Sequence, residues 1–542
     1  MRSLLVAALI GLVALVALAG ACTHSTPITT PRGSWHGTDT LANVPADTPY
    51  LFAWLEAPPE AVRTRLMANA DALIVPKLEE SAAIPLDQRL EMPAARRALL
   101  GIMDAMRGTN PAMYWENLGF KRNGQWIMYG LGVWPVLRVE VADANKLRAI
   151  LADAVKTLNL PIVEQKQLDG VPYWVASKDK LSAIASVTEH DAVVAIVPTA
   201  SLAETLPMVL GTKPVARSLR DSGEIAKLSE SYHLAPYLIT YLDSHRIVDA
   251  LERKDAFATT SVFSAPACHA DYERIADAMP RLVFGYEKLD ANGFMGTLVA
   301  DLAPDIAKRM AAMHTAMPAP PDVAHALVSI VIAADVDTAI ANVRTWMQAL
   351  VDHPFECPVL AKSKEVFADG LEAVNKAIPS ELHGLHGAEL VLDDATEKPP
   401  SGSGYVVVAG DQVAMTMTQM LQKIPGFGGM TIAPDGQPVE LPVGMLGVDG
   451  LRSAHLAMHT GRVAIAVGDR SKTEVSTALA APNAAHSPLA ILTWDVARFI
   501  KHVPSLLKND NKTGLIQFST IVMSVDVRAN ALVFEVGADW LK

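Results

Sequence analysis

The sequence contains few cysteines, few charged residues and few aromatic residues. Its three cysteines are too sparse for a disulfide-dense scaffold, and none stands in the C-x-x-C spacing of structural zinc sites. Charged residues make up 19% of the chain and the net charge is −12, with no block of Lys or Arg. This balance argues against binding of nucleic acid, whose phosphates require a basic surface. It also argues against anionic lipid headgroups, but it leaves neutral and apolar ligands open.

Long hydrophobic runs are absent beyond the N-terminal one, so we do not expect the body of the protein to span a membrane. Hydrophobic residues make up 50% of the sequence, which provides ample surface for a globular core. The chain is too long for one hydrophobic core to keep growing, and two or more packed units are therefore expected.

The N-terminus has the pattern of a bacterial lipoprotein signal peptide. Arg2 precedes an apolar run from Leu4 to Leu18, and the small residues 19–21 stand directly before Cys22. We therefore predict a signal peptide over residues 1–21 and lipidation of Cys22, which would anchor the protein to a membrane. A plain secretory signal is the alternative. A retained span would need about 20 apolar residues and reaches that length only by including the small ones.

The residue after Cys22 indicates which membrane holds the anchor. Thr23 stands where inner-membrane lipoproteins commonly carry an aspartate, so the resemblance to bacterial lipoproteins implies the outer membrane, on its periplasmic face. Residues 22–43 are rich in Thr, Ser, Pro and Gly without an apolar period, and we expect them to form a flexible tether.

Cys268 and Cys357 are the cysteines that remain. Two leftover cysteines in an oxidising periplasm are expected to pair, so we predict a disulfide between them. Two buried free thiols, or a metal pair with the nearby His269 or His353, are the alternatives.

Strand-then-helix segments recur along the chain. Residues 236–248 align without a gap on residues 488–500, and residues 49–56 match the first half of both. An apolar hairpin follows each segment after a helical stretch. Residues 190–197 and 459–467 also match, and each leads into a helical stretch. These matches predict an internal repeat. The hairpins cover residues 126–141, 282–302 and 521–541, and the helical stretches cover residues 201–210 and 471–480.

The repeat determines the expected domain organisation. We predict one α+β repeat unit over residues 44–213 and a second over residues 214–542, in which a C-terminal half-unit after Asn483 closes the second sheet. The fold class is expected to be α+β, with mostly antiparallel sheets and packed helices, because alternating strands stand beside helical stripes. Asp143 is predicted to cap a helix with an apolar stripe from Leu147 to Leu158, and residues 434–437 are predicted as a hairpin turn.

Four segments carry a resemblance to a known family. They read VPADTPY at residues 44–50, ACHAD at 267–271, PRLVFGY at 280–286 and PDG at 434–436. With them, most of the mature chain resembles a family of large Gram-negative periplasmic lipoproteins built from repeated α+β units. The resemblance implies a fold and a compartment. Since the family has no assigned activity, it supplies no functional residues.

Several local patterns fall short of a catalytic or metal site. Ser505 and Lys508 stand too close to the KTG sequence at 512–514 to form the site of a penicillin-binding protein, and the glycines at 426–429 lack the spacing of a nucleotide-binding loop. We therefore expect no catalytic residue, no cofactor and no metal. Three further patterns are set aside. The pair His383/His386 has no third ligand nearby, and His455 and His459 would lie too far apart on one strand face to chelate an ion easily. Met415, Met417 and Met420 cannot all face one ion on a helix.

These observations favour a non-enzymatic protein anchored to the outer membrane, acting as a scaffold or interaction module of the cell envelope. The alternative is a periplasmic carrier or sensor of an apolar ligand such as a lipid. An apolar cavity would favour the carrier, whereas an exposed apolar patch of more than a few hundred Å² would favour the scaffold. The expected partners are the membrane, through the lipid anchor, and an envelope protein or apolar ligand, but not nucleic acid.

Overall fold

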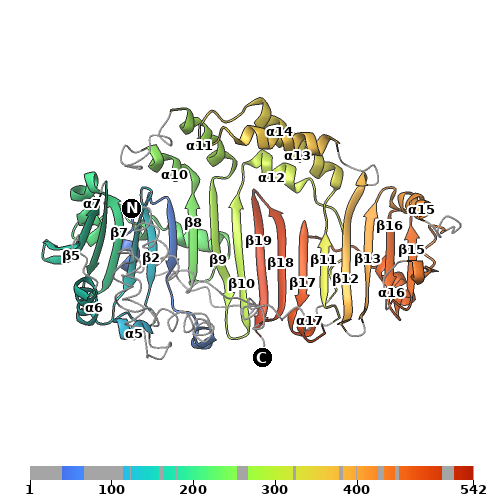
Figure 1. Ribbon diagram of the computed structural model, residues 1–542, viewed down its shortest axis with the longest axis horizontal. Coiled ribbons are helices and arrows are strands. Elements are labelled where there is room, and N and C mark those ends of the chain that lie inside the picture. Colours follow the sequence, from blue (N-terminus) through green and yellow to red (C-terminus); the bar gives the residue numbers. More distant parts are fainter. Residues whose placement is uncertain are drawn as a thin grey trace. The chain divides into compact units, whose positions relative to one another are not determined.

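A computed structural model of the protein shows two compact units, unit 1 from Met1 to Gly296 and unit 2 from Thr297 to Lys542. Both combine an antiparallel sheet with helices, so the fold class is α+β as predicted (Figure 1). The structure describes residues 39–65, 114–122, 124–157, 163–178, 180–252, 266–321, 325–376, 382–397, 400–424, 432–445, 451–502 and 518–540.

The elements of unit 1 alternate between hairpins and short helices. In chain order they are η1 (Asp39–Asn43), β1 (Tyr50–Trp54), α5 (Tyr114–Leu118), β2 (Trp126–Leu131), β3 (Trp134–Glu140), α6 (Ala144–Thr157), β4 (Val163–Leu168), β5 (Val171–Lys178), β6 (Leu181–Val187), β7 (Asp191–Pro198), η3 (Thr199–Ser201), α7 (Leu202–Leu210), α8 (Leu219–Ser222), α9 (Glu224–Ser231), β8 (Leu238–Asp243), α10 (Ser244–Glu252), α11 (Pro266–Ala278), β9 (Arg281–Leu289) and β10 (Gly293–Asp301), the last of which crosses the limit of the unit.

Unit 2 has a similar succession of elements. They are α12 (Pro304–Ala311), β11 (Val328–Ile332), α13 (Val336–Asp352), α14 (Ser363–Lys376), β12 (Leu385–Glu397), β13 (Pro400–Gly410), α15 (Val413–Lys423), β14 (Val439–Glu440), η5 (Val443–Met445), β15 (Ala454–His459), β16 (Arg462–Val467), α16 (Ser471–Ala480), β17 (Ala490–Asp495), α17 (Val496–His502), β18 (Phe518–Arg528) and β19 (Ala531–Trp540).

The strand pairings give both units the same order, except that β4 of unit 1 has no counterpart among the described strands of unit 2. The sheet of unit 1 runs β10-β9-β8-β1-β2-β3-β7-β6-β5-β4. The sheet of unit 2 runs β19-β18-β17-β11-β12-β13-β16-β15-β14. Position by position, β8 corresponds to β17, β1 to β11, β3 to β13 and β7 to β16. The strand order is therefore duplicated within the chain.

The duplicated order agrees with the sequence matches. β7 and β16 lie in the matching segments 190–197 and 459–467, and β8 and β17 lie in the matching segments 236–248 and 488–500. The three predicted apolar hairpins form as β2–β3, β9–β10 and β18–β19. The last two take corresponding places in the two orders, whereas β2–β3 corresponds by position to β12–β13. The two pairs of matching segments and the last two hairpins are therefore structural equivalents.

The limits of the units differ from the predicted ones. Residues 49–56 match residues 236–248 in sequence, but their strand β1 pairs antiparallel with β8, from Tyr50↔Leu242 to Trp54↔Leu238. The two strands are therefore neighbours in one sheet, and β1 corresponds to β11 by position. Unit 1 needs β8 and β9 to complete its sheet, and for this reason it extends to Gly296 instead of ending at residue 213.

Aspartate caps begin the helices that follow equivalent strands. Asp243 Oδ1 accepts a hydrogen bond from the backbone N–H of Arg246 at 3.0 Å, and Asp495 Oδ1 accepts one from the N–H of Arg498 at 2.8 Å. Such a cap satisfies an N–H that lacks an intrahelical partner and contributes about 1 kcal/mol. The predicted cap Asp143 is confirmed, since its Oδ1 accepts from the N–H of Lys146 at 2.9 Å.

The turn predicted at residues 434–437 is present. Gly436 adopts a φ of 81°, and Asp435 Oδ1 accepts from the N–H of Gln437 at 2.9 Å. The strand after the turn, β14, pairs with β15, and Leu441 joins the core cluster that includes Leu456 of β15. Met430 and Thr431, which precede the turn, lie outside the described residues.

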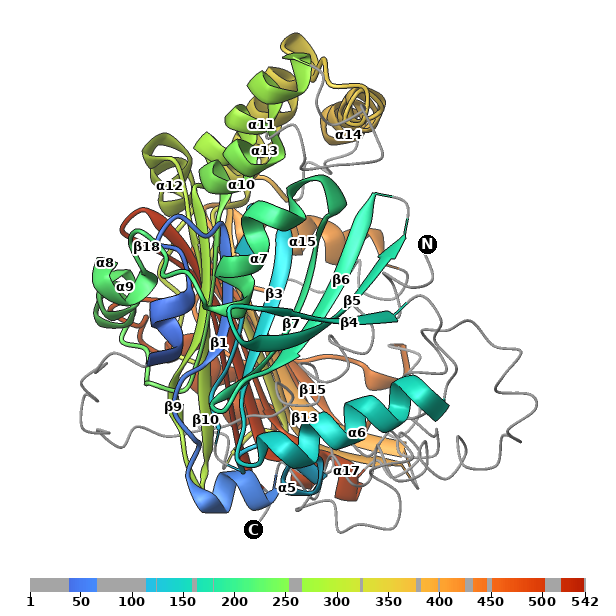
Figure 2. The ribbon, with the colours of Figure 1, turned by 90° about the vertical axis from the view of Figure 1, so that its left-hand side faces the viewer.

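In unit 1, one face of the sheet is covered over its central strands. Leu51, Ile127, Tyr129, Ile239 and Tyr241 point to this side and are fully buried. η1, α8 and α9 lie on one side of the sheet, and α6 lies on the other (Figure 2). Tyr129 Oη reaches the carbonyl of Asn43 in η1 at 3.3 Å, which places η1 on the covered side.

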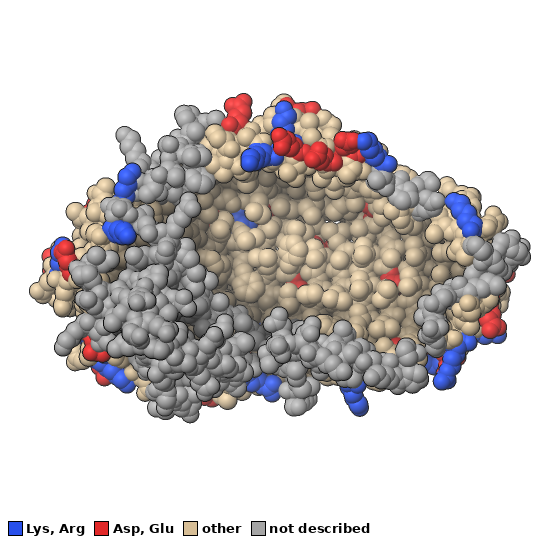
Figure 3. Space-filling view, in the orientation of Figure 1, with Lys and Arg blue, Asp and Glu red and all other residues tan. Residues whose placement is uncertain are grey.

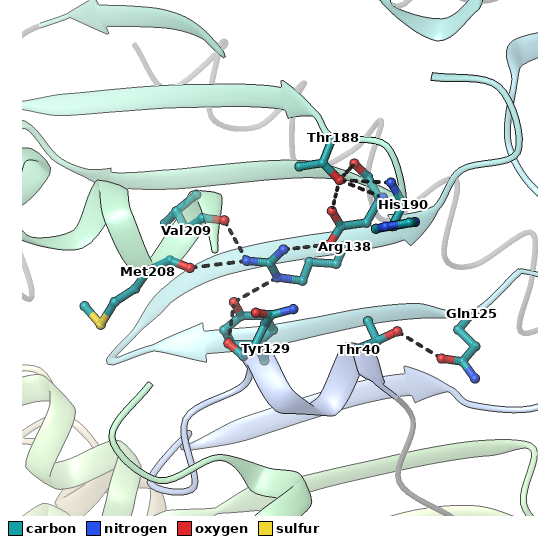
Figure 4. Close-up of polar contacts among 10 residues, drawn as sticks. Thr40, Gln125, Tyr129, Arg138, Thr188, His190, Met208 and Val209 are labelled. Atoms are coloured by element: carbon teal, nitrogen blue, oxygen red, sulfur yellow. Dashed lines mark hydrogen bonds and ion pairs between the residues drawn. The ribbon is translucent and has the colours of Figure 1, made fainter. Parts of the chain in front are cut away.

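A buried arginine connects the covered face to the end of α7. Arg138 of β3 is 1% exposed, and its guanidinium donates to Asp191 Oδ2 at 2.7 Å, to Tyr129 Oη at 3.4 Å and to the carbonyl of Val209 at 2.7 Å (Figure 4). The last carbonyls of a helix lack intrahelical partners and carry partial negative charge, so they bind a cation well. Arg138 therefore caps the C-terminus of α7.

In unit 2 the corresponding cap comes from the neighbouring strand. Arg462 of β16 donates to the carbonyls of Leu479 at 3.2 Å and Ala481 at 2.7 Å, at the end of α16. When the strands of the two units are matched by register, Val407 takes the position of Arg138, and Arg462 takes the position of Asp191.

Candidate functional site

One face of the sheet of unit 2 is apolar and partly open to solvent. We call this surface, on β19, β18, β17, β11, β12 and β13, the apolar face. The registers align its side chains in rows across the strands. One row contains Val536, Met523, Leu492, Ile330, Leu390 and Val406; the rows beside it contain Phe534, Val525, Ala490, Ile332, Ala388 and Val408, and Ala538, Ile521, Trp494, Val328, Leu392 and Gly404.

Large apolar side chains are exposed on this face. Ile330 is 38% exposed, Ile332 48% and Leu390 43%. Val406, Met523 and Val536 are exposed to a similar degree. Over these strands the molecular surface is hollowed and carries few charged side chains (Figure 3). Contiguous exposed apolar surface of this kind marks a binding site in a protein that is otherwise well packed.

The burial pattern of these strands is inverted. In β11, Ser329 is 1% exposed on the covered side while Ile330 and Ile332 face solvent. Glu389 of β12 and Ser524 of β18 also point to the covered side and are 1% and 8% exposed. A sheet with one solvated face normally places its polar residues on that face. The inversion therefore indicates that the apolar face serves more than folding.

Helix α15 covers one end of the apolar face. The central row continues from Val406 into Ile465 of β16 and Leu456 of β15. There Val413 and Leu421 of α15 pack on the sheet in a buried cluster. The helix thus covers the strands from β14 to β16 and bounds the open part of the face.

The open part is large enough for a specific partner. It extends about 24 Å across the strands and about 14 Å along them, from a strand spacing of about 4.8 Å and a rise of about 3.4 Å per residue. The resulting area of about 340 Å² falls within the range of about 300–600 Å² typical of the largest, often functional, patch on a monomer. The strands β11, β12, β17 and β18 are each hydrogen-bonded on both sides, so the face contacts a partner through side chains.

The histidine pair at 383 and 386, which was set aside as a metal site, lies among carboxylates. His383 Nδ1 is 2.5 Å from Asp337 Oδ1, and His386 lies between Asp411, with 2.8 Å from Nε2 to Oδ1, and Asp335, with 3.1 Å from Nδ1 to Oδ2. The hydrogen bond to Asp411, followed by that to Asp335, raises the pKa of His386. The two rings contact separate carboxylates, and the contacts with Asp335 and Asp337 hold the start of β12 against the N-terminus of α13.

The other residues considered in the sequence are not brought together. His455 Nδ1 lies 2.9 Å from Ser471 Oγ, whereas His459 is exposed. Met417 packs against the core, whereas Met415 and Met420 are 53% and 44% exposed, so the three thioethers do not share one environment. Cys22, Ser505, Lys508, the KTG sequence at 512–514 and the glycines at 426–429 lie outside the described residues.

Cys268 and Cys357 are both fully buried and are bonded to each other as a disulfide. The predicted disulfide is therefore present, and the two alternatives, free thiols and a metal pair, do not apply.

A group with the chemistry of metal ligands lies between α10 and α11. His245 Nδ1 is 2.9 Å from Glu273 Oε2, and its Nε2 is 3.6 Å from Asp277 Oδ1. One ligand atom from each of the three residues lies within 4.8 Å of the others. Each nitrogen of the imidazole faces a carboxylate, which is the geometry of a histidine that bridges two helices. This group could not be predicted from the sequence, because its members are brought together only by the packing of α10 on α11.

No protein-family model, no curated protein and no solved structure matches the chain. The resemblance to lipoproteins of repeated α+β units therefore stays a prediction, and function has to be argued from geometry. Within the described residues, none of the helices combines the length and the hydropathy needed to cross a bilayer.

Proposed function

We propose that the protein is a non-enzymatic interaction module of the bacterial cell envelope, anchored through lipid on Cys22 at the periplasmic face of the outer membrane. The observation that carries this proposal is the apolar face, on which Ile330, Ile332 and Leu390 are exposed within a hollowed sheet surface. Covering about 340 Å² of apolar surface at about 25 cal/mol per Å² contributes about 8 kcal/mol before the costs of association.

The proposed location is supported by two independent features. The sequence pattern that ends at Cys22 is that of a lipoprotein signal. The disulfide between Cys268 and Cys357 fits an oxidising compartment outside the cytoplasm.

Binding is favoured over catalysis by the chemistry of the face. Its three aligned rows consist of apolar residues and one glycine, so they offer no acid, base or nucleophile. Asp526, which lies on the opposite side of β18 and is fully buried, serves a structural contact: it is held by His486 Nε2 at 2.9 Å and by Arg528 Nε at 3.3 Å.

Photo-crosslinking in the membrane-anchored protein tests the proposal. A photoreactive residue in place of Leu390 should form an adduct in native membranes, and an added Ile330→Glu should abolish it, because the new charge stands beside position 390 in the same row. The same photoreactive residue at Val366, which is 67% exposed on α14, is the control and should stay unlabelled. Equal labelling at both positions, or none at 390, would contradict the proposal.

A second candidate is a carrier or sensor of an apolar ligand such as a lipid. It is favoured by the hollow and the scarcity of charge over the same strands (Figure 3). The identity of the adduct at position 390 separates the two candidates, since a scaffold yields a protein and a carrier yields a lipid.

A further inference from the structure

We propose that the partner of the apolar face is a lipid, whose acyl chains lie against β11, β12, β17 and β18. This inference rests on the proposed function, because it names the chemistry of the molecule that occupies the same site. Four features of the face support acyl chains over a protein partner: its composition, its hydrogen bonding, its size and the charge of the chain around it.

The most exposed side chains of the face are aliphatic or thioether groups, and its two aromatic side chains, Phe534 and Trp494, are partly buried. The most exposed ones are Ile330, Ile332, Leu390, Val406, Met523 and Val536. Protein–protein interfaces concentrate Tyr, Trp and Arg, and Leu and Val are under-represented among the residues that dominate their binding energy. Acyl chains, in contrast, require only methylene contacts, which these side chains provide.

Hydrogen bonding also favours a lipid. The central strands of the face are paired on both sides, so their backbone offers no free edge to an added strand. A peptide laid on the face would bury its own N–H and C=O groups against apolar side chains, and unpaired buried groups are costly. An acyl chain has no such groups to satisfy.

The size of the face suits acyl chains. The chains of one bilayer leaflet span about 15 Å, half of a hydrocarbon core of about 30 Å. The open part of the face measures about 14 Å along the strands and about 24 Å across them. Lipid chains can therefore lie at nearly full length along the strands, with room for neighbouring chains side by side.

The net charge of the protein indicates the charge of the lipid headgroup. The net charge is −12 and no block of Lys or Arg interrupts it, so an anionic headgroup would meet repulsion. The lipid is accordingly neutral or zwitterionic.

Lipid transfer measures this binding directly. Full-length mature protein is mixed with phosphatidylcholine vesicles that contain a fluorescent phosphatidylcholine as the probe. The amount of probe bound to the protein after the vesicles are removed is measured as the vesicle concentration is raised. We expect saturable binding that is weakened at least about tenfold by the double variant Ile330→Glu/Leu390→Glu. Both residues are partly exposed, so the carboxylates can reach water without unfolding the sheet, which a thermal melt verifies. Val366→Glu makes the same chemical change at an exposed position on α14 and should leave binding unchanged.

The outcomes separate this inference from the proposed function. Equal probe binding by wild type and the double variant overturns the inference, as does stronger binding of phosphatidylglycerol than of phosphatidylcholine. Absence of probe binding together with a protein adduct at position 390 overturns the inference while the interaction module stands. Absence of both probe binding and any adduct overturns both.

Discussion

Arg138 and Asp191 form an ion pair across β3 and β7, with 2.7 Å between Nη1 and Oδ2. The arginine is 1% exposed and also donates to the carbonyl of Val209. Its guanidinium therefore bonds both a carboxylate and the C-terminal end of a helix. Arg138→Met removes the charge and leaves these acceptors unpaired, and we expect the free energy of unfolding to fall by about 3–5 kcal/mol.

Urea denaturation measures this loss. Arg452→Met is the matched control, because Arg452 and Asp469 form an exposed pair, 77% and 67% solvent-accessible, at 3.2 Å. Exposed pairs contribute about 1 kcal/mol or less. Equal losses in the two variants would contradict the structural role of Arg138.

Glu389 should make stability decrease as pH rises from acid to neutral. Burial raises the pKa of its carboxyl to about 7, although Tyr405 Oη donates to Oε1 at 3.2 Å. In the unfolded chain the pKa is about 4.3, so between these values the folded protein holds a proton that the unfolded chain has released. This contribution is complete below the unfolded pKa and is lost as pH rises through the folded one.

Replacement by glutamine isolates the effect. Glu389→Gln should be more stable than wild type by about 1–3 kcal/mol at pH 8 and nearly equal to it at pH 5. Glu440→Gln, at an exposed position of β14, should change stability little at either pH. A difference for Glu389→Gln that does not vary with pH would refute the assignment.

The C-terminal hairpin should be indispensable to unit 2. β18 pairs with β17 from Ala490↔Val525 to Asp495↔Thr520. Deletion from Ile521 onward would expose the edge of β17 and uncover apolar surface, which favours aggregation and proteolysis. Size-exclusion chromatography and limited proteolysis measure this. A truncated protein that is monodisperse and melts within a few degrees of full length would rule it out.

Native protein should offer no alkylatable thiol at Cys268 or Cys357. Their separation, 357 − 268 = 89 residues, closes a long loop, for which chain entropy gives about 4–5 kcal/mol of stabilisation. Reduction should therefore lower the melting temperature and expose both thiols to iodoacetamide, as measured by mass spectrometry. Two alkylated cysteines in unreduced protein would disprove the bond.

Membrane attachment should depend on Cys22. Acyl chains contribute about 0.8 kcal/mol per buried methylene, so a multiply acylated cysteine holds the protein firmly to a bilayer. Cys22→Ala should move the protein into the soluble periplasmic fraction, provided that another peptidase removes the signal. Wild-type protein found mainly in that fraction, or a mature N-terminal peptide without added mass, would count against the anchor.

Local structure could be predicted from the sequence because short-range chemistry determines it. α16 spans residues 471–480 as expected, and Asp143 caps α6 because its side chain reaches the N–H three residues later. Strand pairing could not be predicted in the same way. Residues 49–56 and 236–248 resemble one another because both form apolar strands. These strands are neighbours in one sheet, and sequence similarity alone does not distinguish a neighbouring strand from the equivalent strand of another unit.

The apolar face could not be predicted from the sequence either. In the segment GYVVVAG at residues 404–410, the residues that point to either face of the strand are apolar. This pattern is typical of a strand buried on both sides. Burial depends on the layer that covers a strand, and the helix that supplies it, α15, reaches β14 to β16 while Val406 and Leu390 stay exposed. An uncovered sheet face is a property of tertiary packing.

The arginines at the ends of α7 and α16 show how the two units diverged. Arg138 and Arg462 lie on adjacent strands of the duplicated order. The position that corresponds to each arginine in the other unit holds a residue of different chemistry. A position-by-position comparison would count both as lost, yet both helix termini are bonded to a guanidinium. What was retained during divergence is a cation within reach of the helix end, so among relatives of this chain the arginine should move between the two strands, and its absence from one should be accompanied by its presence on the other.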